Sequence, residues 1–161
     1  MRTIAEGKST MTRHILLAVA SAMVFSNAAF GEEKTTTKHG DSMKITLKIG
    51  DRALTATLID SKTTRDFLSL LPLTLTMNDL FRREKFAHLP RAISEAGKRT
   101  HTYEIGNVAY WSPGRDVAIF YRHDGEKIPN PGLILIGKID SGVDAFNVPG
   151  AVDVTVERVT K

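Results

Sequence analysis

Four consecutive charged residues, Arg82 to Lys85 (RREK), form the first group in this sequence whose chemistry could serve a ligand. A guanidinium donates hydrogen bonds in a fixed fork, so this group could bind a carboxylate or polarise a carbonyl. The alternative is an ordinary solvated loop, which the residue types favour when they are taken alone. We treat Arg83, Glu84 and Lys85 as candidate binding residues.

A second candidate group is aromatic and flanks one turn. Residues 107–122, NVAYWSPGRDVAIFYR, hold two apolar runs that meet at Ser-Pro-Gly-Arg. Aromatic side chains are core residues by default, because each buries a large apolar area. Alternate residues of a strand face opposite sides, so about half of these side chains should point into the protein and half toward an outer groove. The four candidates are Tyr110, Trp111 (the only tryptophan), Phe120 and Tyr121.

The sequence lacks most other patterns of catalytic and metal-binding chemistry. It has no cysteine, which excludes thiolate metal sites and cysteine nucleophiles. No two of the five histidines have the close spacing of a local metal pair, so we expect neither metal nor cofactor. There is no G-x-S-x-G motif. The run GKST at residues 7–10 resembles the end of a phosphate-binding loop, but Arg2 replaces the first glycine of that motif.

The first 31 residues have the pattern of a secretory signal peptide. A basic start precedes the 11-residue apolar run Ile15 to Phe25, and Ala29 and Gly31 occupy the two small-residue positions of a cleavage site. The run is shorter than the roughly 20 residues that cross a bilayer, so we expect no stable membrane span after cleavage. An uncleaved anchor is the alternative. The prediction is export, to the periplasm or outside the cell.

The remaining chain is predicted to be a flexible polar leader, residues 32–42, followed by one domain, residues 43–161. The signal segment holds three of the 22 Lys and Arg residues and one of the 18 Asp and Glu residues, which leaves 19 against 17. These charges are mixed and include no long basic run. The balance therefore does not favour a nucleic-acid partner.

Hydrophobic periodicity predicts a mainly β domain. Residues 44–58 alternate in polarity on both sides of Gly50-Asp51, which is typical of a β-hairpin with one buried face. A short helix should follow, capped by Asp60 or Ser61 and stopped by Pro72. Residues 73–77 alternate again and predict a strand.

The second half of the domain is predicted to be β after an interruption. Residues 78–100 fit neither period, so we expect an irregular excursion with a short strand or helical turn. Four strands are then expected, with one helical turn before the last, within residues 102–111, 116–122, 132–139 and 152–159. Many short strands with one or two helices describe a closed or nearly closed antiparallel barrel, because closure removes exposed edges.

Two segments resemble the signature of the bacterial cyclophilin-like proteins, whose fold is similar to that of cyclophilin. They are YEIGNVAYWSPGRDVAIFY and PNPGLILIGKIDSGVDAF. Upstream, Glu84-Lys85 and Leu89-Pro90 match pairs of that family. The other matches are Gly106, Trp111, Pro113, Phe120, Tyr121, Pro131-Gly132, Gly137 and Ile139. The resemblance implies a mainly β fold, a closed antiparallel cyclophilin-like β-barrel with about two short helices.

One departure from the family concerns the charged group. The family usually has a small Gly-Thr-like pair before Glu-Lys, where this chain has Arg82-Arg83, so a pocket lined by this segment should be more basic or more occluded. Cyclophilins themselves isomerise Xaa-Pro bonds with an arginine in a Phe-His-Arg context. The nearest counterpart here is FRR at Phe81 to Arg83, and the other catalytic motifs are missing.

Three functions remain open at this point. The first is an exported barrel that binds a peptide or small molecule in a groove. The second is a periplasmic peptidyl-prolyl isomerase that uses Arg82 or Arg83. The third is a hairpin that serves only as core and binds nothing. The candidate ligand-binding residues are Arg83, Glu84, Lys85, Tyr110, Trp111, Phe120 and Tyr121.

Overall fold

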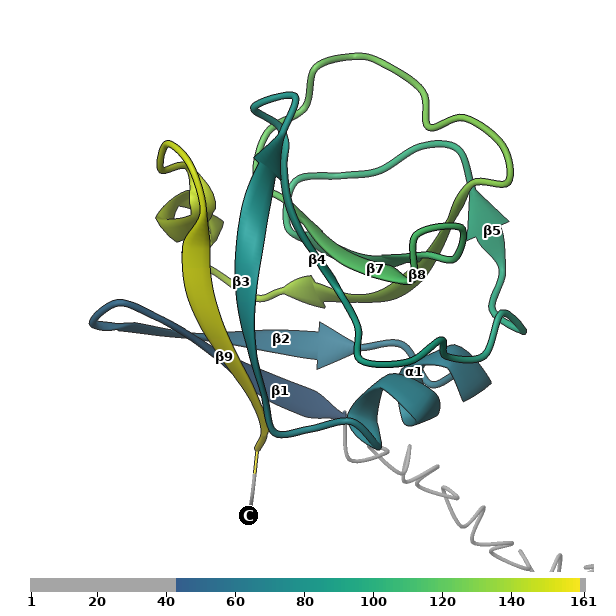
Figure 1. Cartoon of the computed structure of the whole chain (residues 1–161), viewed down its shortest axis with the longest axis horizontal. Helices are drawn as coiled ribbons and strands as arrows, with labels where there is room; N and C mark the ends of the chain where they lie inside the picture. Colours follow the sequence, from purple (N-terminus) through teal and green to yellow (C-terminus); the bar gives the residue numbers. More distant parts are fainter. Residues whose placement is uncertain (1–42, 160–161) are drawn as a thin grey trace, which may run out of the picture. The chain divides into compact units, whose positions relative to one another are not determined.

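The computed structural model describes residues 43–159, and a closed ring of strands is its main feature (Figure 1). The elements in chain order are β1 (Lys44–Ile49), β2 (Arg52–Leu58), α1 (Lys62–Leu68), β3 (Leu73–Leu80), β4 (Glu84–His88), β5 (Arg99–Thr100), β6 (Asn107–Trp111), β7 (Asp116–Phe120), β8 (Leu133–Ile139), the 3-10 helix η1 (Val143–Phe146) and β9 (Val152–Arg158). The signal peptide and the leader, predicted for residues 1–42, lie outside the described residues.

The barrel is antiparallel throughout. Its strands follow in the order β2-β1-β9-β3-β4-β7-β6-β8, and pairing of β2 with β8 closes the ring. The short strand β5 adds to β8. Closure leaves none of the eight ring strands with an open edge. The predicted closed antiparallel barrel is confirmed.

The first hairpin forms where alternation predicted it. Ile49 pairs with Arg52 across the two-residue turn, and Gly50 takes the positive φ of +53° that this tight turn favours. The apolar side chains of both strands other than Ala53 are buried in the barrel, whereas Lys44 and Lys48 of β1 are exposed. The predicted two-residue turn is therefore confirmed.

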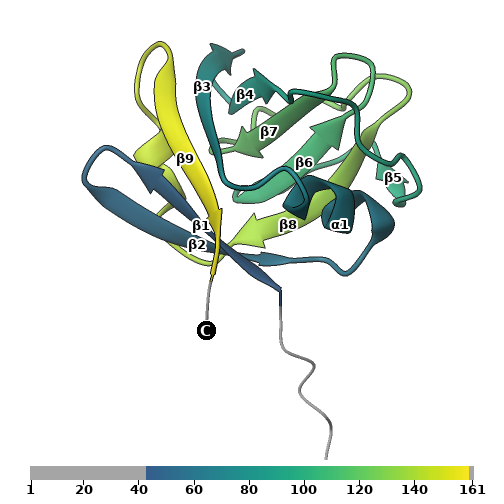
Figure 2. The same ribbon diagram turned by 60° about the horizontal axis from the view of Figure 1, so that its bottom comes forward.

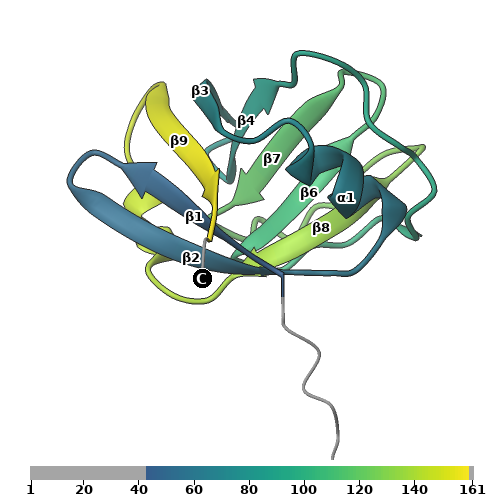
Figure 3. The ribbon, with the colours of Figure 1, turned by 90° about the horizontal axis from the view of Figure 1, so that it is seen from below.

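The two ends of the barrel are covered by short helical elements. Ser61 caps α1, because its Oγ accepts a hydrogen bond from the backbone N–H of Thr64 at 3.1 Å. Figures 2 and 3 show α1 across one end of the barrel, where Phe67 and Leu68 enter the core. The element η1 follows the C-terminal end of β8, and its Phe146 is fully buried. One α-helix and one 3-10 turn thus correspond to the two short helices that were predicted.

The short strand allowed for residues 78–100 is confirmed by β4, but the segment is less irregular than predicted. Strand β3 continues to Leu80, and β4 lies in the barrel wall between β3 and β7. Only the segment from 89 to 98, between β4 and β5, is irregular. The alternation was hidden because β4 places the charged Lys85 on the inner face and buries Glu84 on the outer one.

A second apolar layer lies outside the barrel, on strands β7, β6 and β8. Its buried members are Tyr103, Ala109, Ala118, Phe120, Ile128 and Leu133, with Phe86, Trp111 and Leu135 packed against them. The connection from β7 to β8, residues 121–132, contributes Ile128 to this layer and arches beside these strands in Figure 1. This outer layer contains the candidate site.

Two features are absent from residues 43–159. No helix there is long and apolar enough to cross a membrane. No three His, Asp or Glu side chains in that range gather as metal ligands would.

Candidate functional site

The four aromatic candidates divide between the two faces of the barrel wall. Tyr110 and Tyr121 belong to the interior core, whereas Trp111 and Phe120 belong to the outer layer. This is the alternation predicted for paired strands. Phe120 is fully buried beneath Tyr103, with 4.1 Å between the ring centroids, so Trp111 is the candidate aromatic residue that lines a cavity.

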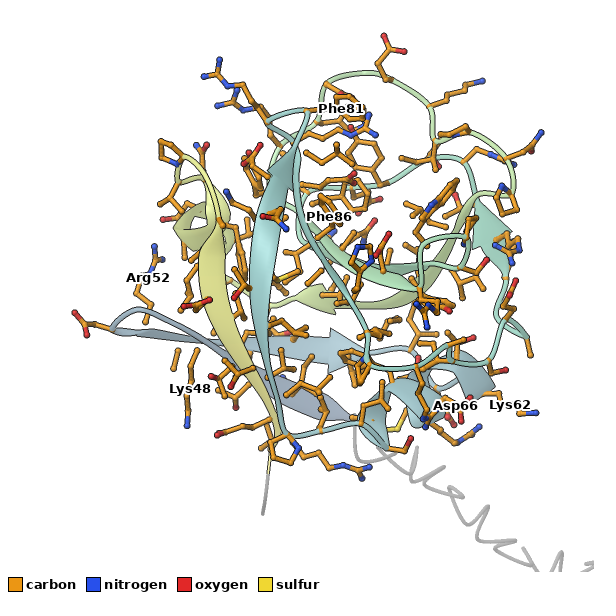
Figure 4. The ribbon with its side chains drawn as sticks, in the orientation of Figure 1. Lys48, Arg52, Lys62, Asp66, Phe81 and Phe86 are labelled. Atoms are coloured by element: carbon orange, nitrogen blue, oxygen red, sulfur yellow. The ribbon has the colours of Figure 1, made fainter. Side chains whose placement is uncertain are left out.

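That cavity has a volume of about 250 Å³ and opens on the outer face of β4 and β7. Most of its wall is apolar and includes three aromatic rings, Phe81, Phe86 and Trp111. Figure 4 shows Phe81 at the tip of the β3–β4 hairpin and Phe86 farther along β4. The remaining apolar lining is Leu80, Ala118, Ile128, Pro129 and Leu133. The polar lining is Arg83, Glu84 and Asp116.

Glu84 is the most unusual group of the cavity. The residue is only 6% exposed, and no group among residues 43–159 donates a hydrogen bond to its carboxylate. The closest cation is Arg83, whose Nη2 lies 4.0 Å from Oε1. Burial raises the pKa of Glu84 to about 7; Arg83 opposes this rise, and the carboxylates of Asp124, Asp116 and Asp79 add to it. Glu84 can therefore hold or release a proton near neutral pH.

Arg83 is buried beside Glu84 but is paired with a different carboxylate. Its Nη1 donates to Asp124 Oδ2 at 3.0 Å, and its guanidinium lies over the rings of Phe81 and Tyr103, 5.0 and 5.5 Å from their centroids. The Tyr103 hydroxyl donates to Asp124 at 2.6 Å, and this bond contributes most to lowering the pKa of Asp124 to about 2. The solvated-loop interpretation was wrong. Arg83 adds little net positive charge to the cavity, because it pairs with Asp124 and the carboxyl groups of Glu84 and Asp116 lie beside it.

Lys85 lies on the opposite side of the wall and does not line the cavity. It is 0% exposed, and its Nζ donates to Asp79 Oδ2 at 2.8 Å and to the carbonyl oxygens of Val148 at 2.6 Å and Gly150 at 2.5 Å. The Tyr121 hydroxyl donates to the same Asp79 oxygen at 2.7 Å. Burial and this bond raise the pKa of Tyr121 to about 12. Lys85 and Tyr121 therefore belong to an interior polar cluster that ties β3 and β4 to the segment between η1 and β9.

The comparisons with known proteins agree with this architecture. The model of the Cyclophilin-like family matches residues 47–157. The chain belongs to the cyclophilin-like family. No curated protein matches the sequence. The solution structure of a hypothetical protein from Archaeoglobus fulgidus is similar, with a TM-score of 0.61 and 23% identity over 76% of this chain and 99% of that one. At this identity, the likeness concerns the fold.

This cyclophilin-like chain has a strained turn at the edge of the cavity. Phe81 and Arg82 have positive φ values of 53° and 55°, at turn positions where glycine and asparagine are the usual residues. Asp79 Oδ1 accepts a hydrogen bond from the Arg82 N–H at 3.0 Å and stabilises the turn. The strained conformation places Phe81 on the cavity wall, although this side chain is 71% exposed. Strained backbone of this kind is common at binding sites.

Arg82→Gly is expected to raise the free energy of unfolding by about 1 kcal/mol, because glycine adopts the left-handed conformation without the steric cost of a side chain. Urea unfolding of both proteins measures this difference. Ser112→Gly is the matched control. Ser112 also lies in a turn but does not have a positive φ, so glycine there should not stabilise the protein. Equal or lower stability of Arg82→Gly would show that the turn carries no strain.

Several cavity residues of this cyclophilin-like domain were missed by sequence reasoning. Phe81 and Phe86 flank the charged group, and their aromatic character is a signal that could have been used. Asp116 is positioned by Gly114, since a Cβ on that glycine would collide with the carboxylate, and Asp116 Oδ1 contacts His88 Nδ1. Ile128, Pro129 and Leu133 gave no local signal, because only the path of the β7–β8 connection brings them to the cavity.

Proposed function

We propose that this cyclophilin-like domain is an exported binding protein that holds an apolar group of a peptide or small molecule in the outer cavity. The observation that supports this most strongly is a cavity with three aromatic walls and a buried carboxyl group that lacks a hydrogen-bond donor within residues 43–159. Ligand sites typically combine apolar walls with a few polar groups. At about 250 Å³, the cavity suits one side chain or one ring better than a large cofactor.

Phe81→Ala is expected to weaken ligand binding about tenfold, because an aromatic contact in a small site commonly contributes more than 1 kcal/mol. The side chain is already 71% exposed, so its removal should leave the fold intact. Trp111, the only tryptophan, lines the cavity and reports occupancy through its fluorescence. Ile105→Ala is the control, since Ile105 is 46% exposed and does not line the cavity. Unchanged Trp111 fluorescence across a broad panel of peptides and metabolites would contradict the proposal.

A second candidate function, peptidyl-prolyl isomerisation, is favoured by one detail of Arg83. Its Nε is buried and has no hydrogen-bond partner among residues 43–159. A donor at this position could bond to a proline amide nitrogen and lower the rotation barrier of about 18–20 kcal/mol. A protease-coupled assay on Xaa-Pro peptides tests this. Activity no higher than buffer, or unchanged when Arg82 and Arg83 both become alanine, would rule it out.

Export is part of the proposal and predicts a defined mature N-terminus. Cleavage after Gly31 should give a secreted chain that begins with Glu32. Intact-mass measurement of the protein from extracellular or periplasmic fractions checks this directly. Ala29→Arg should block cleavage of the signal peptide, whereas Thr37→Arg in the leader should not. Recovery of the full-length chain from the cytoplasm alone would refute export.

A further inference from the structure

The charge balance of the outer cavity points to the kind of ligand it takes. Arg83 pairs with Asp124 through Nη1, and the carboxyl groups of Glu84 and Asp116 also lie on the cavity wall. Asp116 contacts His88 and is buried, with 8% exposure. Glu84 is buried to a similar extent and lacks any donor within the described chain. The cavity therefore holds more negative than positive groups.

A buried carboxyl group without a partner is costly to ionise, and an opposite charge removes most of that cost. The charged groups that act on Glu84 come from every neighbouring element. They are Arg83 in the β3–β4 turn, Asp79 on β3, Asp116 on β7 and Asp124 in the β7–β8 connection. Asp79, Asp124 and Asp116 already contact Lys85, Arg83 and His88, respectively. Glu84 is therefore the carboxyl group that a cationic ligand would pair with.

The aromatic walls favour the same ligand chemistry. A cation near an aromatic face is attracted by the negative face of the ring, most strongly where water is excluded. Phe81 already shows this contact with the guanidinium of Arg83 at 5.0 Å. Phe86 and Trp111 line the same cavity as Glu84.

We infer that the ligand of this cavity is an organic cation with an apolar body, such as an amine or a basic side chain, and that its charge pairs with Glu84. This inference rests on the proposed binding function. When the cation enters, the carboxyl group of Glu84 releases its proton to solvent, and the carboxylate then pairs with the bound cation. Binding should therefore release close to one proton per ligand at pH values where Glu84 of the free protein is protonated. At pH 8, where Glu84 is largely ionised before binding, the release should be small.

Three probes of similar shape separate this inference from simple apolar binding: benzylammonium, benzyl alcohol and benzoate. In the wild-type chain at pH 8, Trp111 fluorescence or amide chemical shifts should show benzylammonium binding at least tenfold more tightly than benzyl alcohol, with benzoate weakest. Benzylammonium affinity should rise about tenfold from pH 6 to pH 8, because Glu84 must be ionised in the complex. Calorimetry in two buffers of different ionisation enthalpy should detect proton release at pH 6.

Glu84→Gln should lose the preference for benzylammonium and keep the affinity for benzyl alcohol, which also reports that the variant is folded. Glu104→Gln, an exposed carboxylate outside the cavity, should bind all three probes like wild type. Equal wild-type affinity for benzyl alcohol and benzylammonium, or an unchanged preference in Glu84→Gln, overturns the cation inference and leaves the binding proposal standing. Failure of every probe at millimolar concentration overturns both.

Discussion

Glu84→Gln is expected to raise the free energy of unfolding by about 3 kcal/mol at pH 8 and to change it little at pH 4. Burial raises the pKa of Glu84 to about 7 in the folded chain, from an ordinary value of 4.5. Below pH 4.5 the carboxyl group is protonated in both states, so it imposes no penalty. Between pH 4.5 and 7 only the unfolded chain releases the proton, so stability falls as the pH rises. Above pH 7 the full loss of stability is reached. The Glu84→Gln variant avoids this loss because glutamine does not ionise.

Chemical denaturation at pH values from 4 to 8 measures this effect. Glu104→Gln is the matched control: Lys138 lowers the pKa of Glu104, which is then ionised in both states between pH 6 and 8. The stability curves of that variant and the wild type should be parallel in this range. If Glu84→Gln changes stability by the same amount at pH 4 and pH 8, the carboxyl group is not held neutral by the fold.

The second large effect is expected at the interior polar cluster. Lys85→Met keeps an unbranched side chain of similar length but removes the ammonium that pairs with Asp79 and satisfies the carbonyl oxygens of Val148 and Gly150. Removal of one member of a buried ion pair leaves an uncompensated charge and typically costs about 3–5 kcal/mol. Urea unfolding at neutral pH should show a loss of this size.

Lys48→Met is the control for this prediction, because Lys48 forms an exposed pair with Glu157 at 2.8 Å. Such surface pairs contribute about 0–1 kcal/mol. The double variant Lys85→Met with Asp79→Asn should lose less than the sum of the two single changes, since each single change leaves the other partner unpaired. A loss below 1 kcal/mol for Lys85→Met would contradict the proposed role of this cluster.

The strands that the sequence predicted either alternate in polarity or form a short apolar run beside a turn. The first hairpin follows this rule, because Ile45, Leu47 and Ile49 enter the core while the residues between them stay more accessible. The aromatic hairpin is apolar on both faces, and the alternating direction of its side chains correctly divided Tyr110 from Trp111. Short-range periodicity is sufficient in both segments, since it depends only on strand geometry.

Strand β4 could not be predicted in the same way. Its inner face carries Lys85, whose buried charge is tolerated only because Asp79 and two carbonyl oxygens from distant segments surround it. Its outer face carries Glu84, which is buried by the second apolar layer. Both burials depend on tertiary contacts, and residue type alone suggests a solvated loop for each. The seven candidates therefore included only three that line the cavity, Arg83, Glu84 and Trp111.

Two costs to stability meet at the same place on this cyclophilin-like domain. The carboxyl group of Glu84 is buried without a hydrogen-bond donor in the described chain, and the adjacent turn holds Phe81 and Arg82 in left-handed conformations. A site that serves only packing has no reason to retain either cost. Groups that conflict with stability are concentrated at functional sites, and this supports the outer cavity as the place where the protein acts.

The most direct test of this account is a map of backbone amide chemical shifts during titration with benzylammonium at pH 8. If the cation binds in the outer cavity, saturable shifts should cluster on β4, on β7 and in residues 128–133, together with the indole N–H of Trp111. Shifts that are absent, or that gather at the β1–β2 turn and the segment after η1, away from the outer cavity, would contradict it.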